Sequence, residues 1–125
     1  QYPLAILDLD ESLKLDPLQP RAYYYRALAK TKLNQHTEAI EDLDTSLGMD
    51  ATHADLFATR SGLKEKTGNY QEAILDADVA INMDPNHAMA YANRASAYCA
   101  LGLIKEALGD CDAAMKLDNN IGLVY

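Results

Sequence analysis

Nineteen Asp and Glu residues are the side chains that could support acid–base or metal chemistry in this 125-residue chain. Eight of them form two series with a step of 34 residues, namely Asp8, Asp42, Asp76 and Asp110, and Asp16, Asp50, Asp84 and Asp118. A catalytic pair of carboxylates would be unique in the chain, whereas these positions are copied from unit to unit. We therefore interpret the repeated acidic residues as structural.

Histidine and cysteine offer no better candidate for a metal or redox site. The His residues form no His-x-x-x-His pair, and His53 and His87 occupy the same position in successive units. Cys99 and Cys111 have neither a metal-binding nor a redox spacing, so we expect two small apolar residues in a reducing compartment. The sequence contains no phosphate-binding glycine loop and no nucleophile–base constellation. It therefore predicts a non-enzymatic chain with no metal and no cofactor. Core-like spacings are found for Met49, Met83 and Met115.

Three arginines also repeat at the 34-residue step. Each interrupts an otherwise apolar stripe, where an unpaired charge would be costly, so a carboxylate partner is expected. Because the Asp8 series has the same period, we predict that each arginine pairs with the preceding unit, and that Asp110 lacks a partner. The predicted pairs are Arg26 with Asp8, Arg60 with Asp42 and Arg94 with Asp76. Two alternatives stay open: a 16-residue pairing within one unit, and arginines that bind a ligand.

The elements that position these side chains are predicted to be helices. Apolar and small residues recur at three- and four-residue steps. Breaks at Asn34-Gln35, Gly68-Asn69 and Gly102 separate paired segments, and Asp-Pro ends the second segment at 16–17 and 84–85. No sustained alternation of β-branched residues indicates a strand. We expect an all-α fold of about seven helices, near residues 2–15, 20–33, 37–49, 54–67, 71–83, 88–101 and 105–117.

The overall composition argues against some classes of partner. The formal net charge of −8 argues against a nucleic-acid partner, because such proteins carry basic patches. No apolar run approaches the roughly 20 residues that span a bilayer, so no membrane partner is expected. We find no pattern of a secretory signal at the start of the sequence, which favours a cytoplasmic setting.

Further positions repeat in register across the units. An aromatic slot holds Tyr23, Phe57 and Tyr91, a small slot holds Ala27, Ser61 and Ala95, an alanine slot holds Ala39, Ala73 and Ala107, and a proline slot holds Pro17 and Pro85. The small and alanine slots predict where the two helices of a unit approach closely. This pattern resembles the tetratricopeptide repeat, a 34-residue helix–turn–helix unit. Departures from the family pattern are Lys30 and Lys64 in a tyrosine slot that Tyr98 keeps, and Ala51 and Asn119 in the proline slot. The resemblance implies an α-solenoid of stacked antiparallel helix pairs in a right-handed superhelix.

The resemblance also implies a single array over residues 1–125. Residues 1–19 hold the second helix of a truncated repeat, residues 20–53, 54–87 and 88–121 form three repeats, and residues 122–125 begin a further one with Tyr125 in its aromatic slot. We interpret the chain as part of a longer array.

Arrays of this family hold a peptide or a partner's helix in a concave groove lined by the first helices, so the resemblance implies a protein–protein interaction scaffold. By that analogy the groove residues are Arg21, Tyr24, Tyr25, Leu28, Lys32, Asp55, Thr59, Gly62, Glu65, Lys66, Met89, Asn93, Ser96 and Cys99. Their charges nearly cancel, so we expect binding that depends little on salt. We expect an apolar or aromatic anchor of the partner against Tyr25, Leu28 and Thr59, with Asn93 bonded to its backbone. For Tyr24, packing between units is an equal alternative.

Two other functions stay open. Some members of the family grip the C-terminal carboxylates of heat-shock chaperones with Lys, Asn and Arg side chains, which would make the chain a co-chaperone. Asn93 matches that pattern, but Ala58 and Gly62 stand where Lys and Asn would be needed. The other is a structural spacer or self-assembling array within a larger protein, associating through its uncapped repeat ends.

Overall fold

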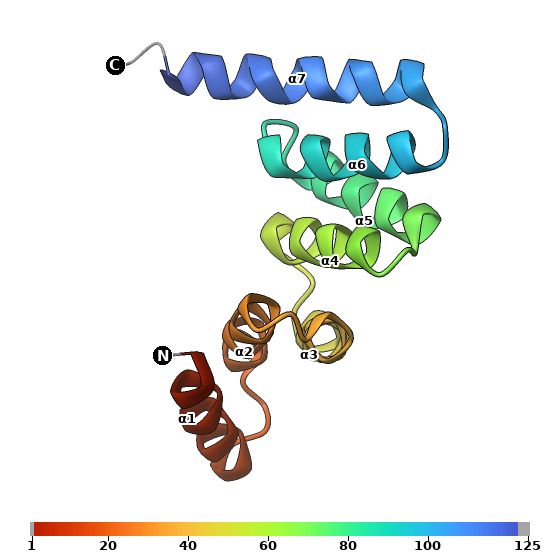
Figure 1. Ribbon diagram of the computed structural model, residues 1–125. Helices are drawn as coiled ribbons and strands as arrows, with labels where there is room; N and C mark the ends of the chain where they lie inside the picture. Colours follow the sequence, from red (N-terminus) through yellow and green to blue (C-terminus); the bar gives the residue numbers. More distant parts are fainter. Residues whose placement is uncertain (1, 123–125) are drawn as a thin grey trace. The chain divides into compact units, whose positions relative to one another are not determined.

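A computed structural model describes the backbone of residues 2–122 and side chains up to residue 118 (Figure 1). Over this range the chain has no strand and seven helices: α1 (Tyr2–Leu15), α2 (Pro20–Lys32), α3 (His36–Met49), α4 (Ala54–Lys66), α5 (Tyr70–Met83), α6 (Ala88–Ala100) and α7 (Ile104–Gly122). The all-α prediction is confirmed, and the first six helices begin and end within one residue of their predicted bounds. Helix α7 was expected to end at residue 117 and continues to Gly122. No proline interrupts it there, and the predicted aromatic slot at Tyr125 lies outside the described residues.

The chain divides into two compact units, residues 1–52 (unit 1) and residues 53–125 (unit 2). In unit 1, α2 packs against both α1 and α3. In unit 2, α4 packs against α5, α6 packs against α4 and α5, and α7 packs against α6. Three consecutive pairs, α2–α3, α4–α5 and α6–α7, are thus joined by short turns into helix hairpins.

The turn of each hairpin contains one residue with a positive φ. These residues are Asn34 (62°), Gly68 (87°) and Gly102 (79°). Glycine adopts this left-handed conformation without a Cβ clash, and asparagine tolerates it better than other residues. The breaks expected from the sequence at these positions are confirmed.

Small side chains form much of the core in both units. Ala27, Ala39 and Leu43 are fully buried in unit 1, as are Ala58, Ala73 and Ala80 among others in unit 2. At the small slot of unit 2, the Ser61 hydroxyl donates a hydrogen bond of 2.7 Å to the carbonyl oxygen of Ala73. A side chain of one helix therefore reaches the backbone of the other, which is the close approach that the small and alanine slots predict.

The methionines and cysteines do not fill the core as expected. Met49, Met83 and Met115 are 38%, 40% and 58% exposed, and both Cys99 and Cys111 are exposed. Met49 and Met83 are the last residues of α3 and α5, beyond the last buried residue of each helix, which is Ser46 in α3 and Ala80 in α5. Met115 and the cysteines lie on a face of α6 and α7 described below.

Candidate functional site

The groove residues expected in unit 1 lie along α2. Arg21, Tyr25 and Lys32 are exposed, whereas Tyr24 and Leu28 are half-buried. The rings of Tyr24 and Tyr25 have centroids 5.9 Å apart and planes tilted by 37°. Because Tyr25 remains 51% exposed, α2 presents an aromatic surface flanked by cationic side chains.

Two of the groove residues expected in unit 2 make contacts inside the unit. The Asp55 carboxylate lies 2.6 Å from Nε2 of His87, whose Nδ1 accepts a hydrogen bond from the Ala90 N–H and so caps α6. The Asn93 amide donates from Nδ2 to the carbonyl oxygen of Ala58 at 2.9 Å. This donor, which was expected to bind a partner's backbone, is therefore engaged between α4 and α6.

The other expected positions of unit 2 differ in exposure. Thr59 is half-buried, whereas Lys66, Met89 and Ser96 are exposed. Gly62 faces Asn93 so closely that a Cβ built on it would lie 3.1 Å from the Asn93 Nδ2 atom. The absence of a side chain at Gly62 thus allows the hydrogen bond between Asn93 and α4.

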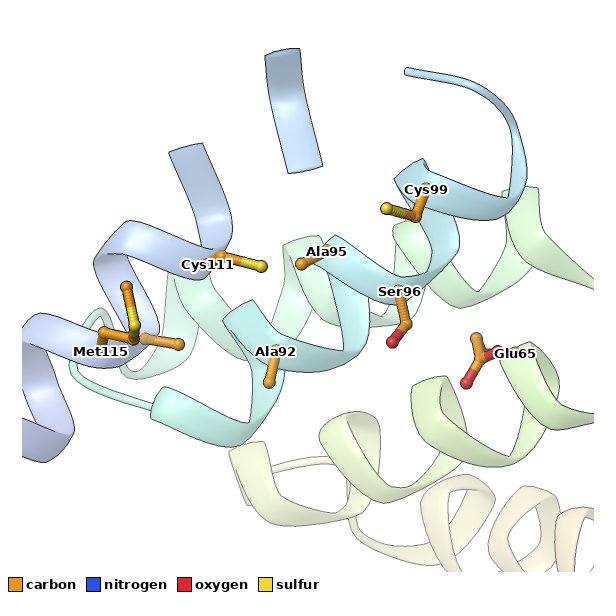
Figure 2. A pocket seen from close by; sticks show the side chains of 8 residues that line it. Glu65, Ala92, Ala95, Ser96, Cys99, Cys111 and Met115 are labelled. Atoms are coloured by element: carbon orange, nitrogen blue, oxygen red, sulfur yellow. The ribbon is translucent and has the colours of Figure 1, made fainter. Parts of the chain in front are cut away.

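A pocket of about 510 Å³ lies in unit 2 on α6 and α7, with one residue of α4 at its edge (Figure 2). Its lining residues are Glu65, Ala92, Ala95, Ser96, Cys99, Cys111, Ala114 and Met115. Figure 2 shows Ala92, Ala95, Ser96 and Cys99 along one helix and Cys111 and Met115 along the next. Three sulfur-bearing side chains and three alanines make the pocket mostly apolar and able to contact an apolar side chain.

Sequence reasoning found only part of this pocket. Ser96, Glu65 and Cys99 were among the expected groove residues, but the residues contributed by α7 were not. The 34-residue register makes Cys111 and Met115 equivalent to Ala77 and Ile81, but a repeated spacing does not reveal which copy is covered. Ala77 is fully buried and Ile81 is partly buried, whereas Cys111 and Met115 are exposed.

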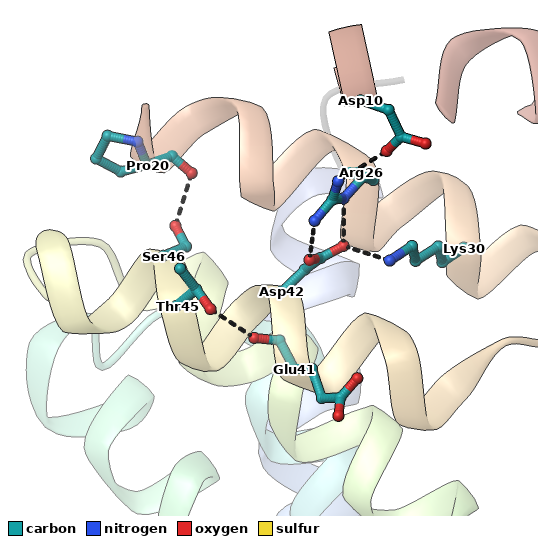
Figure 3. A network of polar contacts seen from close by, with 8 residues as sticks. All are labelled: Asp10, Pro20, Arg26, Lys30, Glu41, Asp42, Thr45 and Ser46. Carbon is teal, nitrogen blue, oxygen red and sulfur yellow. Dashed lines mark hydrogen bonds and ion pairs between the residues drawn. The ribbon is translucent and has the colours of Figure 1, made fainter. Parts of the chain in front are cut away.

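A polar network joins the three helices of unit 1 (Figure 3). Arg26 on α2 donates from Nε and Nη2 to the two carboxylate oxygens of Asp42 on α3, at 2.9 and 2.7 Å. Its Nη1 donates to Asp10 on α1 at 2.7 Å, and Lys30 Nζ lies 3.0 Å from Asp42. The Asp42 side chain is only 6% exposed, so its charge is buried and fully paired, which offsets its desolvation. The guanidinium also lies 5.5 Å from the ring centroid of Tyr23.

Unit 2 repeats this arrangement at two places. Arg94 donates to Asp110 on α7 at 2.7 and 2.8 Å and to Asp78 on α5 at 2.8 Å. Arg60 donates to both carboxylate oxygens of Asp76 at 2.9 Å. The arginines therefore connect the two helices of a hairpin, and in unit 2 Arg94 also reaches the helix of the preceding hairpin.

The predicted partners of the arginines were wrong, and the pairing within one hairpin is correct. The observed pairs are Arg26–Asp42, Arg60–Asp76 and Arg94–Asp110. In an antiparallel hairpin, residues equally distant from the turn lie opposite each other, and Asn34 stands midway between Arg26 and Asp42. Asp8 is exposed on α1 and forms no ion pair among the described residues. The 34-residue period alone could not distinguish pairing with the preceding unit from pairing within one hairpin, because both sets of residues repeat at that step.

The network also affects the protonation of its members. The hydrogen bonds that Arg26 and Arg94 donate to the carboxylates of Asp42 and Asp110 raise the pKa of both arginines above the ordinary value, although burial opposes the change. Burial raises the pKa of Tyr98, and the nearby Arg94 charge opposes this rise. The arginines therefore stay charged and bound to carboxylates, which favours a structural role over ligand binding.

Among residues 2–118, no cluster of three or more His, Cys, Asp or Glu side chains is arranged to hold a metal ion. None of the described helices combines the length and apolar character that crossing a membrane requires.

The sequence profile of the ETO1 C-terminal domain matches residues 2–93. A comparison with curated protein sequences gives no match.

Solved structures with the same fold include tetratricopeptide-repeat domains. The second such domain of Spaghetti (RPAP3), bound to the HSP90 peptide SRMEEVD, has a TM-score of 0.76 and 29% identity over 79% of this chain and 92% of that chain. The Arabidopsis OM64 domain has a TM-score of 0.79 and 22% identity, over 81% and 84% of the two chains. A crystal structure of MamA has a TM-score of 0.84 and 23% identity over 94% of this chain and 68% of that chain. This chain spans 64% of a second MamA structure, or about two thirds of its length. The predicted repeat fold is confirmed.

Proposed function

We propose that this chain, which belongs to the ETO1 C-terminal domain family, is a protein–protein interaction scaffold. It binds a peptide or helix of a partner protein on the first helix of its hairpins. The observation that carries the proposal is the exposure of large apolar side chains there. Tyr25 on α2 is 51% exposed and Met89 on α6 is 45% exposed, although other faces of both helices are packed. Aromatic side chains are enriched at binding hot spots, and methionine adapts to varied partners.

In unit 1 the binding surface is centred on Tyr25, with Leu28 one turn further along α2. The side chains of Arg21 and Lys32 are exposed near the two ends of the helix. This arrangement suits a segment that places an apolar or aromatic side chain on Tyr25. The partner's backbone is not held by the Asn93 donor, because that donor binds Ala58.

The chemistry of the chain favours a protein partner over other classes. The second RPAP3 domain, which shares the fold, is bound to a peptide. The net charge of −8 disfavours nucleic acid and anionic lipid surfaces. We place the chain in a cytoplasmic setting, as a binding module without catalytic activity.

A selection of random peptides displayed on phage tests the proposal. Selected peptides are titrated by calorimetry against the wild-type chain, the Tyr25→Ala variant and a Leu75→Ala control. Leu75 is a large, exposed apolar residue, but it lies on α5, the second helix of its hairpin. We expect Tyr25→Ala to weaken binding at least tenfold, about the effect of a moderate hot spot, and Leu75→Ala to leave it unchanged. Equal affinities for all three proteins, with unchanged circular dichroism, would refute the proposed surface.

Two alternatives are separated by direct measurements. Similarity to the RPAP3 domain favours a co-chaperone that binds the peptide SRMEEVD. Ala58 and Gly62 occupy clamp positions in unit 2, so we expect no binding of this peptide at concentrations that saturate the RPAP3 domain. A structural spacer would instead show concentration-dependent association in sedimentation experiments and select no peptides.

A further inference from the structure

The cationic residues of α2 divide into a paired set and a free set. The helix has no acidic residue, and its cationic residues are Arg21, Arg26, Lys30 and Lys32. Arg26 and Lys30 are bound to Asp42 in the network of unit 1. Arg21 and Lys32, the free cations, are exposed and form no ion pair with a residue that the structure describes. The exposed surface of α2 is therefore positive, although the net charge of the chain is −8.

The free cations lie on the same face of α2 as the residues proposed to bind the partner. At steps of four, three and four residues, a single stripe of the helix carries Arg21, Tyr25, Leu28 and Lys32. The two cations are about 16 Å apart along the helix axis, since each residue adds about 1.5 Å. Tyr25 is 51% exposed and Leu28 is half-buried between them. An apolar contact surface thus lies between two positive charges.

Arg21 does not stabilise the helix that carries it. It lies in the first turn of α2, which contains no acidic residue. The partial positive charge of a helix N-terminus favours an acidic side chain and opposes a cation. Helix α4 follows this rule, because Asp55 occupies the equivalent position in its first turn. An anion supplied by a partner would give Arg21 the counter-charge that its own helix lacks.

The ends of the stripe would stay exposed in a longer array. In unit 2, α6 has the complete hairpin α4–α5 before it and packs against both helices. The positions of α6 equivalent to the two free cations are Met89 and Ala100, and both are exposed. Asn93, the equivalent of Tyr25, is half-buried. A preceding hairpin therefore covers part of the middle of the stripe and leaves both charged positions accessible.

We propose, on the premise of the proposed function, that the segment bound on α2 is an acidic amphipathic helix of a partner protein. It carries two carboxylates eleven residues apart, with apolar residues four and seven positions after the first carboxylate. These positions share one face of a helix, as their counterparts do on α2. Because the steps read the same in both directions, the partner helix can lie parallel or antiparallel to α2.

An extended segment fits the stripe less well than a helix. Side chains on one face of a strand are about 13 Å apart at a four-residue step and about 20 Å apart at a six-residue step. Neither distance matches the roughly 16 Å between the two free cations. The spacing of the charges therefore favours a helical partner.

The charge of the stripe also changes the expected response to salt. The near balance of charge over all the expected groove residues depends on Asp55 and Glu65, which belong to α4. On α2 no acidic side chain offsets the free cations. Raising the salt concentration from about 0.05 to about 0.5 M should therefore weaken binding on α2 several-fold. This differs from the weak salt dependence that the groove as a whole suggests.

The probe for this proposal is a synthetic peptide of alanine and glutamine with blocked ends, which carries two glutamates and two leucines at the proposed positions. Its binding to the full chain is measured by calorimetry for the wild type, the double variant Arg21→Glu/Lys32→Glu and the control Lys105→Glu. Lys105 is exposed on α7 in unit 2, away from the stripe. We expect at least about tenfold weaker binding to the double variant and no change for the control, because two attractions become repulsions.

Two altered peptides test the charge and the helix separately. A peptide with lysines in place of both glutamates should bind the double variant and not the wild type. A peptide with the same charges and leucines but prolines between them should not bind, because it cannot form a helix. No binding of the first probe to the wild type, or equal binding of the proline peptide, would overturn the acidic helix as the partner.

The peptides selected on phage separate this proposal from the proposed function. If their binding requires Tyr25 but is equal for the wild type and for Arg21→Glu/Lys32→Glu, the proposed function holds and the acidic helix is wrong. If no selected peptide requires Tyr25, both are wrong. Circular dichroism should show the same helix content for the wild type and the double variant, because both substituted side chains are exposed and unpaired among the described residues.

Discussion

Removal of the Asp42 carboxylate provides a direct test of the ion-pair network. Asp42→Ala leaves Arg26 and Lys30, whose side chains are 19% and 17% exposed, without their shared partner. Arg26 retains one contact to Asp10, which is 40% exposed. Breaking a buried pair by removing one partner costs about 3–5 kcal/mol, because the remaining charge is uncompensated. Asp10→Ala removes a contact that water can replace and should cost about 1 kcal/mol or less.

The free energy of unfolding of these variants is measured by urea denaturation monitored by far-ultraviolet circular dichroism. With an m-value of about 2 kcal/mol/M, a loss of 3 kcal/mol lowers the urea midpoint by about 1.5 M. Asp8→Ala serves as a control because Asp8 is exposed. It should shift the urea midpoint by no more than a few tenths of 1 M. A midpoint for Asp42→Ala within about 0.3 M of the wild type would show that the network is not buried as described. A larger loss of stability for Asp8→Ala than for Asp42→Ala would instead support the pairing of Arg26 with Asp8.

Three further outcomes follow from unit 2. Gly62→Ala should raise the free energy of unfolding by about 1 kcal/mol in an Asn93→Ala background, because alanine favours the helix. The gain should be smaller in the wild type, where the new Cβ crowds Asn93. Equal gains in the two backgrounds of a double-mutant cycle would contradict this close contact. Gly68→Ala should cost about 1–2 kcal/mol because φ is 87°, whereas Gly48→Ala, inside α3 with open space around its Cβ, should be stabilising in thermal unfolding. Burial raises the pKa of Tyr98, so the folded chain holds the phenol proton more tightly than the unfolded chain. The stability that this difference contributes is complete below the ordinary tyrosine pKa and is lost as pH rises through the pKa of the folded state. Stability should therefore fall less for Tyr98→Phe than for the wild type between pH of about 9 and about 11, and identical losses would show that Tyr98 is not protected.

Several features of the fold could be predicted from the sequence because they depend on local interactions. Helix bounds followed from the spacing of small and apolar residues, and the hairpin turns followed from Asn34, Gly68 and Gly102. The alanine and small slots indicated where the helices approach, as the bond from Ser61 to the Ala73 carbonyl shows. A residue's own conformational preference and its neighbours within one turn are sufficient for these predictions.

The candidate binding surfaces could not be predicted fully from the sequence, because the exposure and pairing of their residues depend on the tertiary structure. A 34-residue period repeats every spacing equally, so it could not tell whether Arg26 meets Asp8 or Asp42. The antiparallel geometry of the hairpin places Asp42 opposite. The period likewise could not show that Asn93 is bound to Ala58, or that Cys111 and Met115 are exposed where Ala77 and Ile81 are covered. The sequence by itself determined the helices and their turns, because these rest on interactions within a few residues. Only the packing of one helix on another decided which charges are paired and which apolar residues remain open to a partner, since burial is a property of neighbours that lie far apart in the chain.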